Sequence, residues 1–79
     1  MITKAELIKM IDEAIITEES AMGIYDHHLK AILPRSGLSE ETRSEIMRNL
    51  NTLSDESAKH KKLLLSLKNE IEKEERNVF

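Results

Sequence analysis

The sequence predicts an all-α protein in which two long amphipathic helices form an antiparallel hairpin, and two hairpins form a four-helix bundle. Apolar residues recur at alternating steps of three and four over most of the 79-residue chain, the spacing of one helix face. Pro34 and Gly37 interrupt this repeat in one short segment near the middle. Each apolar repeat is wider than the seam of an isolated helix pair, which favours a homodimeric bundle.

The first helix is expected over residues 3–33. Thr3 is a good N-cap, and Glu6 stands three residues later, where its carboxylate would complete a capping box. The core-facing positions form a stripe that one carboxylate interrupts: Ile8, Ile11, Ile15, Glu18, Met22, Tyr25, Leu29 and Ile32. Pro34 disfavours helical geometry in the residue before it, so we expect a turn over residues 34–38.

The second helix is expected over residues 39–76. Ser39 is its predicted N-cap, and Glu40 and Glu41 stand near the positive end of the helix dipole. Two polar residues follow one another in its stripe where Leu or Ile would be expected. The stripe consists of Ile46, Leu50, Leu53, Ser57, His60, Leu64, Leu67 and Ile71. Because the connection is short, the two helices are expected to pack antiparallel as a single domain.

Composition narrows the possible partners. The chain has 12 basic and 15 acidic residues and a net charge of −3, so nucleic acid is not an expected partner. It has no cysteine, which excludes thiolate metal sites. No apolar run reaches the roughly 20 residues that span a bilayer, and no signal peptide opens the chain. We therefore expect a cytoplasmic protein without a membrane partner, and the small core favours a homo-oligomer, most simply a dimer.

The polar interruptions of the two stripes are the candidate functional residues. Glu18 and His60 are expected in the contact between the helices, where a carboxylate is unfavourable unless it is paired, hydrogen-bonded or bound to metal. Glu56 precedes His60 by one helical turn, so both can reach one divalent ion. Two copies of these residues would supply the carboxylates and imidazoles of a carboxylate-bridged di-iron centre.

The same residues resemble the half-bundle of ferritin-like and rubrerythrin-like proteins. The resemblance rests on Glu18, Ala21 and Tyr25 in the first helix and on residues 55–63 in the second. It implies a homodimer like that of the encapsulated ferritins, with iron or another divalent metal as cofactor. Glu18 would be the bridging carboxylate, and His60 the histidine of a Glu-x-x-His motif.

One position departs from the family pattern. The Glu of the Glu-x-x-His motif falls on Ser57, so Glu56 would have to replace it with a shifted geometry. The resemblance therefore implies metal binding more than catalysis, and iron oxidation, if present, would be weak. We do not predict a catalytic residue.

Two other interpretations stay open. In the first, the Glu18–His60 layer binds no metal and only sets the register of a structural or protein-interaction module. In the second, the run from His27 to Ala31 resembles the phosphoacceptor motif of histidine phosphotransfer domains, with His27 as the acceptor.

Counting back from the turn also places Glu18 level with Ser54 rather than with His60.

Overall fold

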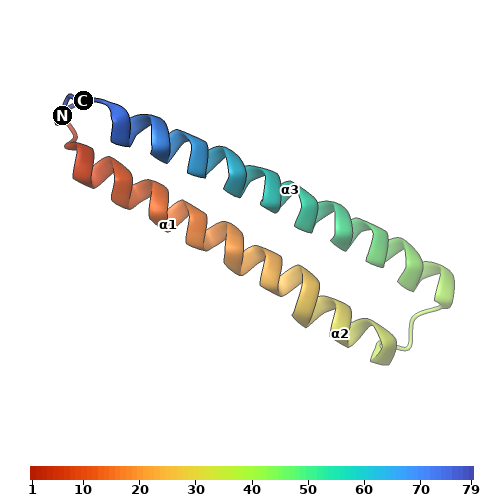
Figure 1. Cartoon of the computed structure of the whole chain (residues 1–79). Coiled ribbons are helices and arrows are strands. Elements are labelled where there is room, and N and C mark those ends of the chain that lie inside the picture. Colours follow the sequence, from red (N-terminus) through yellow and green to blue (C-terminus); the bar gives the residue numbers. More distant parts are fainter.

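The computed structural model describes all 79 residues, which form two antiparallel helical arms (Figure 1). In the first arm, helix α1 (Lys4–Gly23) continues into the π-helix η1 (Ile24–Leu29), the short helix α2 (Lys30–Ile32) and the 3-10 turn η2 (Leu33–Arg35). A connection over residues 36–39 leads to helix α3 (Glu40–Lys73), which forms the second arm. The prediction of an all-α helical hairpin is confirmed.

The hairpin is narrow and elongated, and it measures 56 × 16 × 15 Å. Both chain ends lie together at one end, and the connection lies at the other (Figure 1). The connection turns at Gly37, whose φ of 74° lies in the left-handed region that glycine adopts without strain. None of the helices combines the length and the apolar character that crossing a membrane requires.

Both predicted N-caps are confirmed. The Thr3 hydroxyl accepts a hydrogen bond from the Glu6 backbone N–H at 3.1 Å, and the Ser39 hydroxyl accepts one from the Thr42 N–H at 3.2 Å. The Glu6 carboxylate accepts a bond from the Thr3 hydroxyl rather than from a backbone N–H, so the capping box differs from the prediction. These caps satisfy backbone donors that helical bonding leaves free at each start.

The second helix ends at Lys73, three residues before its predicted end, because the chain termini pair with each other. Ile2 and Phe79 exchange two backbone hydrogen bonds of 3.1 and 2.8 Å. The guanidinium of Arg76 lies 4.7 Å from the centroid of the Phe79 ring. The sequence did not indicate this pairing, since the last residues continue no helical repeat.

The contact line between the two arms, called the seam below, contains a small core. Four apolar side chains are buried there: Ile11, Ile15, Leu33 and Leu50. Ser54 and Ser57 are the buried polar residues, each 7 % exposed. No large side chain is fully buried, so the seam alone removes little apolar surface from water.

Helix α3 meets the first arm with a different face from the one predicted. Four predicted positions do lie at the seam: Leu50, Ser57, Leu64 and Ile71. Three of the other four positions are wrong, because Ser54, Lys61 and Lys68, each one residue further on, take the places of Leu53, His60 and Leu67. As a result Leu53 and Leu67 are 45 and 49 % exposed, and the His60 side chain is 54 % exposed. The fourth, Ile46, is half-buried.

The predicted stripe of the first arm is also wrong beyond Tyr25. Leu29 and Ile32 are 40 and 60 % exposed, whereas the next residue, Leu33, is only 7 % exposed. The cause is the π-helix η1, whose wider turn takes up one extra residue and moves every later position by one. The apolar repeat of a regular α-helix cannot anticipate such an insertion.

The π-helix allows a test by deletion. Removing His28, an exposed residue of η1, should return the segment to α-helix and keep both flanking stripes on the seam. Removing the exposed Glu13 from α1 should instead rotate Ile11 by about 100° relative to Ile15. We expect the His28 deletion to preserve the free energy of unfolding, and the Glu13 deletion to lower it by about 2 kcal/mol or more.

Chemical denaturation followed by circular dichroism measures both effects. Equal destabilisation by the two deletions would show that the π-helix does not absorb an extra residue.

Candidate functional site

Two of the three predicted metal ligands lie in direct contact across the seam. The Nδ1 atom of His60 in α3 is 3.4 Å from the Oε1 atom of Glu18 in α1. The Glu18 side chain is 23 % exposed and that of His60 is 54 % exposed, so the pair lies at the edge of the seam. The expectation that Glu18 stands level with Ser54 is wrong, because α3 is shifted along the first arm relative to the pairing that counting residues from the turn gives.

The third predicted ligand does not join this pair in one hairpin. Glu56 is an exposed residue one helical turn before His60, and its carboxylate lies 3.7 Å from the Lys59 ammonium. No group of three or more His, Cys, Asp or Glu side chains in the hairpin is placed to hold a metal ion. A single chain therefore offers one carboxylate–imidazole pair with a further carboxylate nearby.

The other residues considered from the sequence lie elsewhere. Ser57 is buried at the seam. Tyr25 is half-buried at the start of η1. His27 and His28 are both exposed, although regular α-helical spacing would place His28 beside the first stripe. The π-helix again accounts for the difference, since it changes the direction of the residues within it.

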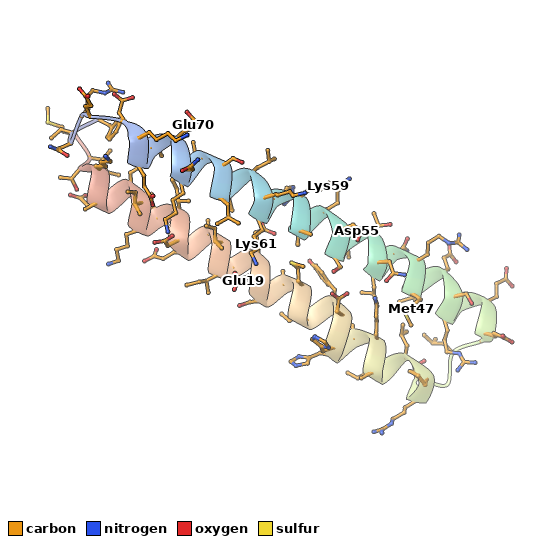
Figure 2. The ribbon with its side chains drawn as sticks, in the orientation of Figure 1. Glu19, Met47, Asp55, Lys59, Lys61 and Glu70 are labelled. Carbon is orange, nitrogen blue, oxygen red and sulfur yellow. The ribbon has the colours of Figure 1, made fainter.

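The opposite edge of the seam carries three polar contacts that join the arms at regular intervals; we call these the polar ladder. They are Asp12–Lys68 at 2.8 Å, Glu19–Lys61 at 3.1 Å and Asp26–Ser54 at 2.9 Å. Each step of the ladder is seven residues in both arms, the repeat that returns a supercoiled helix to the same side. Figure 2 shows Glu19 and Lys61 side by side between the two arms.

The contacts of the polar ladder shift two pKa values. The hydrogen bond that the Ser54 hydroxyl donates to Asp26, aided by the nearby Lys30 ammonium, lowers the pKa of the Asp26 carboxyl. The hydrogen bond to Asp12 raises the pKa of the Lys68 ammonium. In each case the partner across the seam favours the charged form.

The polar ladder was not predicted, although the sequence contains a signal for it. Acidic residues at 12, 19 and 26 repeat every seven residues, and so do Ser54, Lys61 and Lys68 in the second helix. An apolar stripe with two flanks leaves open which flank turns inward. Pairing the acidic repeat of the first helix with the serine and lysine repeat of the second would have indicated which flank faces the other helix.

Comparison of the chain with protein-family models, with curated proteins and with solved structures found no match.

The Asp26–Ser54 bond makes stability depend on pH. Because the pKa of Asp26 is lower in the folded chain than its ordinary value of 3.8, the bond stabilises the fold above that pH. This stabilisation is lost as the pH falls through the folded pKa. Ser54→Ala should therefore raise the Asp26 pKa toward its ordinary value and destabilise the fold more at pH 7 than at pH 2.

Carboxyl ¹³C chemical shifts measured over a pH titration report the Asp26 pKa, and denaturation at the two pH values reports the stability. Ser66→Ala is the matched control, because Ser66 is an exposed serine of the same helix. An unchanged Asp26 pKa in Ser54→Ala would contradict the assigned cause.

Proposed function

We propose that this chain binds iron or another divalent metal ion between two hairpins, in a homodimeric four-helix bundle of ferritin-like type. The observation that carries the proposal is the 3.4 Å contact between Glu18 and His60. This pair lies on the same side of the hairpin as a row of exposed leucines and isoleucines. A second hairpin covering those residues would also cover the pair.

The apolar side of the hairpin, called the open face, is defined by large apolar residues of both arms that are 40–68 % exposed. They are Met10, Ile24, Leu29, Ile32, Leu53, Leu63 and Leu67. Helical spacing puts them on the edge of the seam opposite the polar ladder: Leu67, for example, is about 100° from the ladder residue Lys68 around α3. Exposed large apolar residues that gather on one side of a protein mark interaction surfaces.

The exposed area supports a partner of similar size. A compact protein of 9.1 kDa is expected to expose about 4,900 Å². The hairpin exposes 5983 Å², which exceeds this expectation by about 1,100 Å². A standard protein interface buries about 800 Å² of each partner. Covering the open face with a second hairpin would therefore bring the chain to an ordinary ratio of surface to mass.

Two hairpins supply enough carboxylate and imidazole ligands for a divalent ion, whereas one hairpin does not. One hairpin supplies an imidazole and a carboxylate already in contact, which is too few ligands for a stable site. A second copy related by a dyad doubles this number, and Glu56 of each copy stands one turn from His60. Helical bundles with carboxylate-rich metal sites use this combination of glutamates and histidines on facing helices.

The Ser57 position argues for binding rather than turnover. Ser57 is buried at the seam and carries no carboxylate, so the bridging ligand of the Glu-x-x-His motif is absent. Iron held there would supply one-electron chemistry toward oxygen or peroxide. The chain itself would position Glu18, Glu56 and His60. The second hairpin, by covering the open face, would exclude water from these ligands.

A second candidate function is a protein-interaction module without a metal. The direct Glu18–His60 contact favours it, because two side chains that already pair with each other need no ion between them. The open face is common to both candidates, so metal content distinguishes them.

Metal content per chain tests the proposed function. Protein purified without a histidine tag is incubated anaerobically with ferrous iron, manganese or zinc, then desalted and measured by elemental analysis. We expect about one ion per chain, as in a two-metal carboxylate bundle. Glu18→Gln and His60→Gln should each lower this by at least tenfold, because each removes a ligand from both halves of the site.

Two variants serve as matched controls for metal content. Glu19→Gln changes the neighbouring carboxylate on the polar ladder, and His28→Gln changes an exposed histidine of η1. Both should retain the ion. Metal at background level in the wild-type protein, or equal loss in Glu18→Gln and Glu19→Gln, would exclude the metal site and favour the interaction module.

Oligomeric state tests the open face separately. Leu65 and Leu67 are 47 and 49 % exposed, but they lie about 200° apart around α3, and only Leu67 belongs to the open face. Leu67→Glu should abolish the dimer by placing a charge in its interface, whereas Leu65→Glu should leave it intact. Sedimentation equilibrium distinguishes the 9.1 kDa chain from a particle of twice that mass. A dimer equally stable in both variants would contradict this assignment.

A further inference from the structure

A cleft of about 560 Å³ lies at the turn end of the hairpin, away from the candidate metal ligands. Its apolar wall consists of Leu33 and Pro34 from the end of the first arm and Met47 from α3. Two arginines of α3, Arg43 and Arg48, supply its positive charge. Figure 2 shows Met47 toward this end of the molecule. The volume falls in the range of small-molecule sites.

Arg43 is the residue of this cleft whose charged side chain has no partner within the chain. Its guanidinium has five N–H donors, yet it makes no hydrogen bond and no ion pair within the chain. Its Nε atom is buried and has no acceptor, the only such side-chain atom in the hairpin. A buried charged donor without an acceptor is unfavourable, so an acceptor from outside the chain would stabilise it.

The other basic side chains at the seam do have partners from the first arm. Lys61 and Lys68 pair with acidic residues of the polar ladder, and Lys30 pairs with Asp26 at 3.3 Å. Arg43 precedes Lys61 by 18 residues, five full helical turns, so it lies on the same side of α3. The first arm offers no carboxylate at that level, because its last residues are Leu33, Pro34 and Arg35.

We propose that this cleft binds an organic monocarboxylate with an apolar body. The carboxylate would accept two parallel hydrogen bonds from the Arg43 guanidinium, the geometry that arginine favours, with Arg48 adding a second positive charge. The apolar body would lie against Leu33 and Met47. Glu40 also lines the cleft, and its negative charge disfavours a ligand with a second anionic group.

The cleft remains accessible in the proposed dimer. Asn51 lines the cleft, and Leu53 belongs to the open face. The two residues project about 200° apart around α3, so a second hairpin on the open face would leave the cleft uncovered. Ligand binding here is thus independent of metal binding and goes beyond the proposed function.

Titration with naphthalene-2-carboxylate tests the proposal, with the arginine Nε–H signals followed by ¹H–¹⁵N NMR. We expect saturable binding that shifts the Arg43 Nε–H signal. Arg43→Gln should weaken binding at least tenfold, because it removes a bidentate charged bond. Arg43→Lys, which keeps the charge without the paired donors, should weaken it less.

Arg35→Gln is the matched control, since Arg35 is an exposed arginine at the same end that does not line the cleft. It should bind like the wild type, and the neutral naphthalene-2-carboxamide should bind at least tenfold more weakly than the acid. The proposal is overturned by equal affinity in Arg43→Gln and Arg35→Gln, by equal affinity for acid and amide, or by no saturable binding at millimolar concentrations.

Discussion

The polar ladder determines how the two arms of this hairpin lie against each other. Asp12–Lys68, Glu19–Lys61 and Asp26–Ser54 repeat every seven residues on one edge of the seam. Surface ion pairs such as the first two contribute little to stability individually. Their regular spacing nevertheless selects one register and one rotation of α3, because a shift of one residue would separate all three pairs.

This rotation decides which side chains remain outside. With Ser54, Lys61 and Lys68 turned toward the first arm, Leu53, His60 and Leu67 are left on the opposite edge. The lysine stems pack at the seam while their ammonium groups reach the acidic partners. The hairpin thereby acquires one polar edge that is satisfied within the chain and one apolar face that is not. The Glu18–His60 pair lies with the apolar face, which is why we connect metal binding with assembly.

The fold was predictable to the level of helices and caps, whereas the packed faces were not. Thr3 and Ser39 begin helices as local hydrogen bonding requires, and Pro34 and Gly37 separate the arms. The site was predictable in part, since Glu18 and His60 do meet. The cleft around Arg43 could not be expected, because it forms only where the end of the first arm lies beside the beginning of α3.

By itself the sequence determined three features that depend on neighbours within a few turns: the two helix starts, the region of the connection and the presence of two amphipathic faces. Only the tertiary structure decided which flank of each face turns inward. A helix with an apolar stripe and polar flanks can rotate about its own axis, so that one flank or the other faces its partner, with little change in the interactions within the helix. The π-helix at Ile24–Leu29 and the contacts of the polar ladder remove this freedom. The π-helix departs from the regular helical repeat, and the ladder contacts join residues that lie far apart in the chain.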